Sequence, residues 1–427
     1  METIPCARGV LLPALILASL SPTPSGAADT PLTLMQVIEY AQQHNSDLKV
    51  LAAEKGLRDA VRIKAGIRPD PVLDLEAATG ALTGSSNENR ITIGISREFS
   101  VTGKRMKRLD IAERELDIYN WQLADRKRLL QEEIRNAFYD TLLANERVSL
   151  ADRFIDLNRQ LLEVARERFS AGDIPELEFN LVKVELARST VSRLELSKAR
   201  LQSQARIRSL MGADGGPEQS VAGSLDAAEA AVKPLAALIP LAMAHRPDLK
   251  ALASENKRGE AEIALARAET IPDITAGFFY SHEQRADATG TGDVTARDNL
   301  LGIRLSMPVP LYGRSQAGVQ EAMARKNSSD ARSAAAAALV VREVEAAYDS
   351  FQIAAATQAL YKTGIIPQLE ENLRLTREAY SLGEIGIQAV IQEQKKFFEV
   401  HDSYLSALHA RQTALVKLEA AVGSPLE

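Results

Sequence analysis

The sequence predicts a mainly α-helical protein with a small β part, built from one unit that occurs twice. Three observations lead to this fold class. The chain of 427 residues contains two related halves. Each half has long stretches without glycine or proline, in which apolar residues recur every seven positions, as in coiled-coil helices. Each half also has two short segments in which apolar and polar residues alternate, as in half-buried strands.

Composition excludes several classes of protein. One cysteine cannot form an internal disulfide or a cysteine-based metal site. A net charge of −6 gives no basic footprint for nucleic acid, so we expect no nucleic-acid partner. Beyond the N-terminal segment, no stretch has the roughly 18 apolar residues of a membrane-spanning helix.

The N-terminus has the order of a secretory signal. An apolar run from Val10 to Leu20 follows Arg8 and precedes the small residues 25–28. This order predicts a signal peptide over residues 1–28, so the mature chain would leave the cytoplasm.

The rest of the chain is duplicated. We expect a first repeat over residues 29–212, a linker over 213–233 and a second repeat over 234–427. The matches, each given with its counterpart, are 44–49 with 245–250, Pro71 with Pro272, Gly94 with Gly302, Gly103 with Gly313, and Gly172 with Gly383.

Each repeat predicts a helix, two strands, a long helix, a turn and a helix. The first helix is expected over 33–67, with its counterpart over 233–270. Residues 104–170 contain no glycine or proline and predict one helix of about 100 Å. The helices over 33–67 and 176–211 are each about 54 Å long, so two of them stacked end to end match the long one. A shift of the heptad seam along 104–170 indicates a change of packing partner.

Four strands of about nine residues are expected, the length that crosses a bilayer when tilted. They begin at Val72, Arg90, Ile274 and Leu301, and polar loops are expected over 81–89 and 283–299. One face of each strand is apolar and the other polar, as in a barrel wall between lipid and water. The predicted lipid-facing residues are Leu73, Leu75, Ile91, Ile93, Ile95, Leu301, Ile303 and Leu305, and the predicted lumen-facing residues are Asp74, Glu76 and Arg304.

Four strands cannot close a barrel, and an open sheet edge in lipid leaves costly unpaired backbone groups. Strands that span a membrane would therefore require several copies of the chain. Two copies would give eight strands with a filled interior, and three would give twelve and an aqueous lumen. Two ordinary soluble hairpins packed on the helices are the alternative.

The doubled unit resembles the TolC family of outer-membrane efflux proteins over essentially the whole mature chain. The most specific marks are the paired Asp-Leu-Lys segments, the prolines before the strands, and the paired motifs at 169–174 and 380–385. The resemblance implies a homotrimer in the outer membrane of a Gram-negative bacterium. Twelve strands would form a barrel in the outer-membrane lipid, and the long helices would form a periplasmic tunnel. Its partners would be a periplasmic adaptor (membrane fusion protein) and an inner-membrane pump of the RND type.

The resemblance also implies where the adaptor docks. The tip of the tunnel would carry Gly172, Asp173, Ile174, Gly383, Glu384 and Ile385. Many relatives place aspartates six and nine residues after the second tip glycine, where this chain has Ala389 and Gln392. Residues 97–105 resemble the heavy-metal, CzcC-like branch, which implies metal cations as cargo.

No catalytic constellation, cofactor site or metal site is expected. The five histidines are scattered and lack a metal-ligand spacing. The resemblance therefore implies a passive exit duct of a tripartite efflux system, and we expect no enzyme. The alternative is a secreted or periplasmic coiled-coil adaptor without a membrane barrel.

Overall fold

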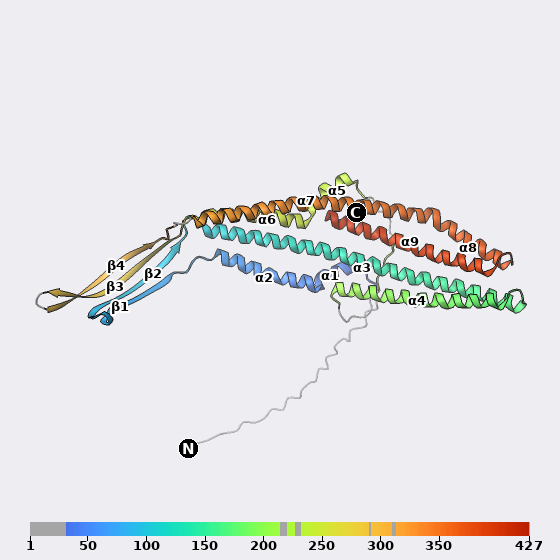
Figure 1. Ribbon diagram of the computed structural model, residues 1–427, viewed down its shortest axis with the longest axis horizontal. Helices are drawn as coiled ribbons and strands as arrows, with labels where there is room; N and C mark the ends of the chain where they lie inside the picture. Colours follow the sequence, from blue (N-terminus) through green and yellow to red (C-terminus); the bar gives the residue numbers. More distant parts are fainter. Residues whose placement is uncertain (1–30, 214–219, 227–231, 290–291, 310–312, 427) are drawn as a thin grey trace, which may run out of the picture.

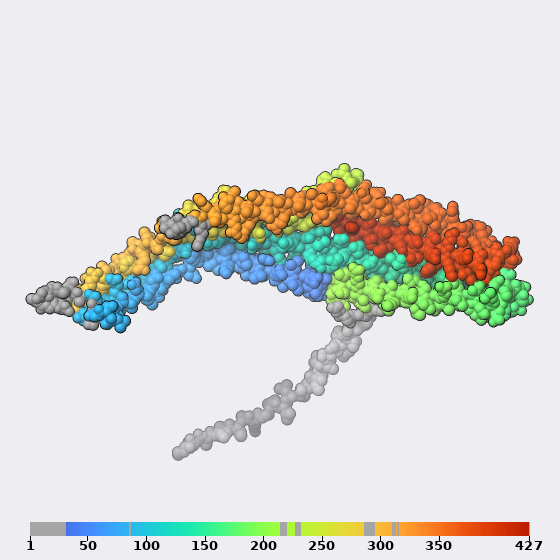
Figure 2. All heavy atoms as spheres, in the orientation of Figure 1, coloured from blue at the N-terminus to red at the C-terminus, as the bar shows by residue number. Residues whose placement is uncertain are grey.

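A computed structural model describes residues 31–213, 220–226, 232–289, 292–309 and 313–426. The expected signal peptide lies outside the described residues, and the expected linker is described only in part. The protein is a long body with a β-sheet at one end and two helical turns at the other (Figure 1). In the space-filling view the body is bowed along its length (Figure 2).

Both halves contain the same order of elements. The first has α1 (Leu34–His44), α2 (Ser46–Gly66), β1 (Val72–Gly80), a 3₁₀ turn (Ala81–Thr83), β2 (Ser85–Phe99), α3 (Lys104–Ala171) and α4 (Glu176–Met211). The second has α5 (Leu235–His245), α6 (Pro247–Glu269), β3 (Ile274–Thr289), β4 (Gly292–Ser306), α7 (Arg314–Leu360), a π-helical turn (Tyr361–Ile365), α8 (Ile366–Ser381) and α9 (Ile387–Val422). The prediction of a mainly α-helical chain with duplicated hairpins and four strands is confirmed.

The first predicted helix of each repeat is wrong in one respect, because each is two helices. Asn45 separates α1 from α2, and its side-chain Oδ1 accepts hydrogen bonds from the backbone N–H groups of Asp47 and Leu48. This is an N-cap, which restarts a helix at a new angle. Arg246 separates α5 from α6, where Pro247 favours a helix start and disfavours helical geometry in the residue before it.

The long helix α3 changes its packing partners along its length, as the heptad shift indicated. It packs against α2 and α6 near the sheet and against α4 and α9 toward the turns (Figure 1). Helices α2, α1 and α4 follow one another along α3, so short helices stacked end to end match the long one. In the second half the corresponding long path is α7 and α8, interrupted by the π-helical turn.

The stacked helices meet at a glycine in each repeat. Gly212 ends α4 with a φ of 68°, and a Cβ placed there would lie 2.5 Å from the carbonyl oxygen of His44. Asn45 Nδ2 also donates to the carbonyl oxygen of Leu210 at 2.9 Å. Gly423 ends α9 with a φ of 77° and packs in the same way against Arg246. Only glycine combines this close approach with a left-handed backbone at little cost.

The four strands form one antiparallel sheet in the order β1-β2-β3-β4. The predicted length of about nine residues is correct for β1 but wrong for β2, β3 and β4, which have 15, 16 and 15 residues. Most of the two predicted polar loops is strand, because ladder hydrogen bonds use the backbone and do not require apolar side chains. Strands β1 and β4 keep one free edge each.

A buried ion pair joins the sheet to the helices. Lys104, the first residue of α3, is 5% exposed, and its Nζ lies 2.9 Å from Asp273 Oδ1 just before β3. Burial acts to raise the pKa of the Asp273 carboxyl, but hydrogen bonds and the charge of Lys104 outweigh burial and lower it. Because a positive charge at a helix N-terminus is unfavourable, Asp273 offsets both the charge and its burial.

Candidate functional site

The sheet exposes its apolar face and shields its polar face. On β2, the side chains of Ile91, Ile93 and Ile95 are 49 to 56% exposed, whereas Thr92 between them is 6% exposed. A sheet of a soluble protein has the opposite arrangement, with the apolar face on the core. All eight predicted lipid-facing residues lie on the exposed apolar face: Leu73, Leu75, Ile91, Ile93, Ile95, Leu301, Ile303 and Leu305. Their contact with lipid stays a prediction.

The three predicted lumen-facing residues lie on the other face. Asp74, Glu76 and Arg304 line one shallow hollow of the sheet. Ser96 Oγ donates to Asp74 Oδ2 at 2.8 Å. Among the described residues, neither Glu76 nor Arg304 has a carboxylate or cation partner within ion-pair distance.

An aromatic ring that sequence reasoning missed lies in the same hollow. The guanidinium of Arg304 lies over the ring of Phe279 on β3, 5.3 Å from the ring centroid, and so forms a cation–π contact. A Cβ on Gly302 would lie 2.4 Å from the ring, so this glycine makes room for it. Glycine inside a strand often marks such a close approach, so Gly302 indicated that a group packs there but not which one.

A second polar cluster lies farther along the same face. The carboxylate of Glu283 is 8% exposed and accepts ion pairs from Arg90 and Arg285, each at 2.7 Å. Next to it, Thr92 Oγ1 donates to Ser281 Oγ at 3.1 Å. Sequence reasoning missed the role of Glu283 because it placed this residue in a loop.

The predicted tip residues form two similar turns at the far end of the body. Gly172 and Gly383 have φ angles of 83° and 79°. The N–H groups of Asp173 and Glu384 donate back to the carbonyl oxygens of Arg168 and Ala379 at 2.8 and 2.9 Å. Both turns are therefore helix ends of the kind that glycine supplies.

Within each turn the three predicted residues differ in exposure. Asp173 and Glu384 are exposed, whereas Ile174 is 7% exposed and packs with Val182 and Ile387 in a small core shared by both hairpins. Ile385 is partly buried against the same core. The isoleucines therefore hold the turns together, and the acidic residues face solvent.

Arg168 links the two turns, which the sequence did not indicate. Its Nη1 donates to the carbonyl oxygen of Tyr380 at 3.0 Å, and its guanidinium lies 4.9 Å from the centroid of the Tyr380 ring. Tyr380 is 2% exposed. Ala389 and Gln392, where many TolC relatives have aspartates, are both exposed on α9.

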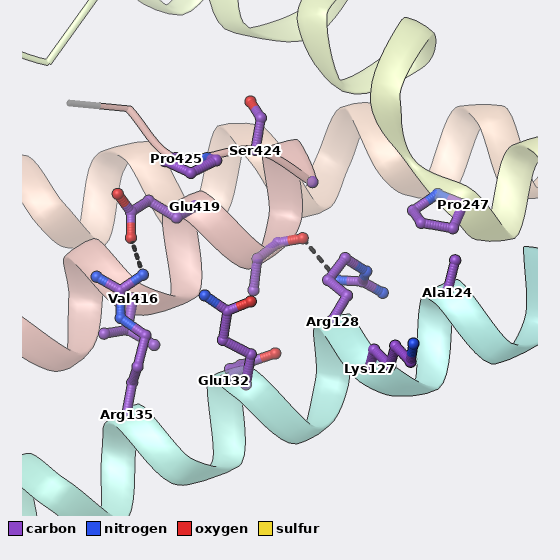
Figure 3. A pocket seen from close by; sticks show the side chains of 13 residues that line it. Ala124, Lys127, Arg128, Glu132, Arg135, Pro247, Val416, Glu419, Ser424 and Pro425 are labelled. Carbon is purple, nitrogen blue, oxygen red and sulfur yellow. Dashed lines mark hydrogen bonds and ion pairs between the residues drawn. The ribbon is translucent and has the colours of Figure 1, made fainter. Parts of the chain in front are cut away.

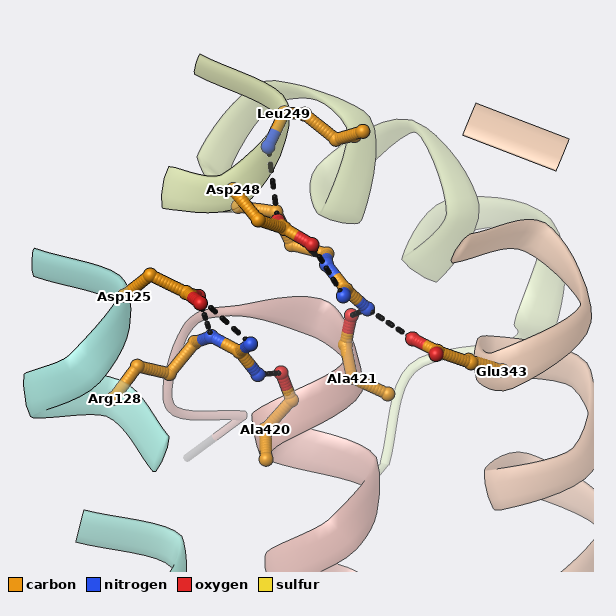
Figure 4. A network of polar contacts seen from close by, with 8 residues as sticks. Asp125, Arg128, Asp248, Leu249, Glu343, Ala420 and Ala421 are labelled. Carbon is orange, nitrogen blue, oxygen red and sulfur yellow. Dashed lines mark hydrogen bonds and ion pairs between the residues drawn. The ribbon is translucent and has the colours of Figure 1, made fainter. Parts of the chain in front are cut away.

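Halfway along the body, two arginines hold the C-terminal end of α9 (Figure 4). Arg128 of α3 donates to the carbonyl oxygen of Ala420, and Arg246 donates to that of Ala421. Cations at this end of a helix are stabilising because its last carbonyl groups are negative. We call Arg128, Arg246 and their acidic partners Asp125, Asp248 and Glu343 the equatorial network.

A cavity of about 250 Å³ lies beside this network, between α3 and α9 (Figure 3). Arg135 and Glu419 form an ion pair across it. Burial raises the pKa of the Glu132 carboxyl in its wall, against the charges of Arg128 and Lys417. Charges of both signs line the cavity, so it carries no clear preference for one ligand.

The described residues contain no group of three or more histidine, cysteine or acidic side chains that could hold a metal ion. His409 Nε2 lies 2.8 Å from Asp140 Oδ1, and the His401 ring contacts the Phe397 ring at a tilt of 44°, with 4.2 Å between the ring centroids. The two histidines therefore have separate partners. Among the described helices, none has a stretch that is both long and apolar enough to cross a membrane.

Both repeats match one known protein family. The profile of the family described as "Outer membrane efflux protein" matches residues 37–213 and 238–424, one match in each repeat. The chain belongs to this family. Membership places the protein in the outer membrane of a Gram-negative bacterium and makes it an efflux exit duct, as the sequence predicts.

Two relatives in the family come from Cupriavidus metallidurans. The cobalt-zinc-cadmium resistance protein CzcC is 23% identical over 406 residues, covering 95% of this chain and 93% of the relative. The nickel and cobalt resistance protein CnrC is 24% identical over 276 residues, covering 64% of this chain and 62% of the relative.

Solved structures share the fold. CusC, described as a transmembrane channel, superposes with a TM-score of 0.74 at 17% identity, covering 92% of both chains. The CmeC outer membrane channel of Campylobacter jejuni has a TM-score of 0.73 at 13% identity, covering 92% of this chain and 86% of CmeC.

Proposed function

We propose that three copies of this chain form a passive exit duct for heavy-metal cations, fed by a periplasmic adaptor and an inner-membrane pump of the RND type. The observation that carries the proposal is the polarity of the sheet. Its apolar face is exposed, its polar face is shielded, and two edges are unpaired. Lipid outside and water inside would satisfy both faces, and neighbouring copies would satisfy the edges. The duct conducts its cargo without changing it chemically.

Exposed apolar seams on the helices support assembly from several copies. Leu177, Val184 and Val191 recur every seven residues along α4 and are 56 to 71% exposed. On α7, Ile353 and Leu360 have the same spacing and are 69% and 67% exposed. Seams at heptad spacing bury themselves against another helix, and a large exposed apolar surface marks an interaction site. A neighbouring copy would cover both seams.

The tip supports docking of an adaptor. Two glycine turns end the helical hairpins side by side, with the exposed residues Asp173, Leu177, Leu382 and Glu384 around them. Exposed apolar side chains with charges beside them suit a helical partner that approaches the end of the body. Gly172 and Gly383 set the shape of this end, and Ile174 and Ile385 anchor it from inside.

The metal cargo is supported by the relatives. CzcC, similar along 95% of this chain, is named for resistance to cobalt, zinc and cadmium. With no metal-binding cluster among the described residues, selection of the cargo would belong to the pump. Deleting the gene should lower tolerance to these cations, and the intact gene should restore it. Unchanged metal tolerance together with lost tolerance to organic drugs would contradict the metal assignment.

The duct itself is tested by fractionating cells, determining the mass of the detergent-solubilised protein, and measuring conductance in a planar bilayer. A trimer from the outer membrane that conducts ions is expected. A soluble periplasmic species without conductance would contradict the barrel and favour the coiled-coil adaptor.

A further inference from the structure

At the end of the sheet nearest the helices, the two free edges carry opposite charges on the polar face. Edge strand β1 presents Asp74 and Glu76, and edge strand β4 presents Arg304. Within the described part of its own chain, Arg304 rests on Phe279 and reaches no carboxylate. Two strands separate it from the acidic edge. In an assembly of several copies, Arg304 would face a residue on β1 of the next copy.

The duplication shows which positions of β2 and β4 are equivalent. Gly103 and Gly313 are the N-caps of α3 and α7, and both have positive φ angles, 66° and 61°. They are therefore equivalent positions in the two repeats. Counting back the same number of residues from each makes Gly94 of β2 equivalent to Arg304 of β4.

Strands β1 and β3 also have equivalent positions in the two repeats. Each is preceded by a Pro-Asp dipeptide, at 69–70 and at 272–273. Counting forward from these dipeptides makes Asp74 equivalent to Gly277, and Glu76 equivalent to Phe279.

The observed register supports both equivalences. Asp74 pairs with Gly94 in the first hairpin, and their counterparts Gly277 and Arg304 pair in the second. The sequence matches of Gly94 with Gly302 and of Pro71 with Pro272 are therefore each wrong by two residues. A short stretch of alternating residues leaves such shifts undecided, because a shift of two keeps every side chain on its face.

The pairing of β2 with β3 then predicts the pairing of β4 with β1 of the next copy. Gly94 lies directly opposite Phe279. Their counterparts are Arg304 and Glu76. If copies join as the two repeats join within one chain, Arg304 of one copy lies directly opposite Glu76 of the next. An even number of strands per chain makes this junction antiparallel, like all others in the sheet.

We propose that Arg304 of each copy pairs with Glu76 of the next copy on the polar face, and that this ion pair sets the register in which the barrel closes. The proposal rests on the assembly described above. Directly opposite side chains in antiparallel strands have Cβ atoms about 5 Å apart, within reach of an arginine and a glutamate. The bare edges supply backbone hydrogen bonds at any register, and the charges select one. Pairing also neutralises Arg304, so Asp74 remains as the negative charge at this level of the lumen.

Cysteine cross-linking in the full-length protein tests the register. In a Cys6→Ser background, the variant Glu76→Cys with Arg304→Cys should form disulfides under mild oxidation. Because the two positions are too far apart within one chain, the products should be covalent dimers and trimers on a non-reducing gel. Leu305→Cys with Glu76→Cys is the matched control, because Leu305 is the next residue along β4 but lies on the apolar face. It should form none.

Charge exchange tests the ion pair itself. Arg304→Glu should lower the yield of assembled trimer at least about fivefold, because like charges then face each other. The exchange variant Glu76→Arg with Arg304→Glu should restore it.

Three outcomes would overturn the proposal. Trimers that conduct normally but do not cross-link at 76 and 304 would overturn the register and leave the exit duct standing. More efficient cross-linking of Glu76→Cys with Ser306→Cys would show a register shifted by two residues. A wild-type protein that neither assembles nor conducts would defeat both the register and the proposed function.

Discussion

A charge on the apolar face of the sheet provides the sharpest test of strand orientation. Ile93 and Ile303 lie in the middle of the apolar stretches of β2 and β4 and are 49% and 68% exposed in the isolated chain. An arginine near the middle of a bilayer costs about 2 to 4 kcal/mol on the lipid face of a barrel. The double variant Ile93→Arg with Ile303→Arg should therefore lose about 4 to 8 kcal/mol of insertion free energy per chain.

Leu300→Arg is the matched control for this experiment. Leu300 lies on the same strand as Ile303 but on the polar face, and it is 45% exposed. An arginine there would face the water of the lumen and should leave assembly nearly unchanged.

The assay is refolding of the protein into phospholipid vesicles, followed by urea titration and by the yield of membrane-assembled trimer in cells. A loss of 4 kcal/mol corresponds to about a thousandfold change in the equilibrium. We expect the double variant to remain outside the membrane while the Leu300→Arg control assembles. The orientation would be refuted if the double variant assembled like the wild type and the control did not.

Three further predictions concern the helical body, each measured by the unfolding free energy or midpoint of the solubilised protein. Gly212→Ala should cost at least about 2 kcal/mol, because the new Cβ would meet the carbonyl oxygen of His44. Gly172→Ala has the same left-handed strain in open space and should cost only about 1 kcal/mol; equal losses would contradict the packing argument. Arg246→Met should cost about 3 kcal/mol by leaving Asp248 and Glu343 without their cation, and a neutral effect would show that the equatorial network is dispensable. Burial lowers the pKa of His401 below its ordinary value of 6.5, so the unfolded chain takes up a proton first. The unfolding free energy should therefore be at its full value above about pH 6.5 and fall below it. His401→Gln should flatten this dependence on pH, and an unchanged dependence would show that other groups cause it.

Much of the fold followed from short-range patterns in the sequence. The run from 104 to 170 without glycine or proline predicted α3 to within a residue, because nothing in it can end a helix. The breaks at Asn45 and Arg246 were missed, although Asn45 is a residue that favours helix caps and Arg246 precedes a proline. In both places the break is a short stretch without glycine or a large apolar residue, at 42–47 and 245–248, so the cap residue and the proline alone marked the boundary. The strands were found by alternation, but their ends were not, because the outer parts of β3 and β4 pair through the backbone regardless of side-chain polarity.

The sequence likewise predicted one part of the candidate site and not the other. Alternation assigned Asp74, Glu76 and Arg304 to one face without a structure, because side-chain direction in a strand depends only on parity. The contact of Arg304 with Phe279 and the contact of Arg168 with Tyr380 could not be read from the sequence. Each joins residues from different elements, and their distance depends on register and helix packing.

The sequence by itself determined that the chain is duplicated, that its helices are long and that its strands have one apolar and one polar face. Periodicity and the placement of glycine and proline are local properties, so they can be read along the chain. Only the tertiary structure decided that the apolar face of the sheet is exposed, that α9 ends between Arg128 and Arg246, and which residues pair between strands. These features depend on contacts between residues far apart in the chain, and shifts of register that keep the pattern of faces leave the sequence pattern unchanged.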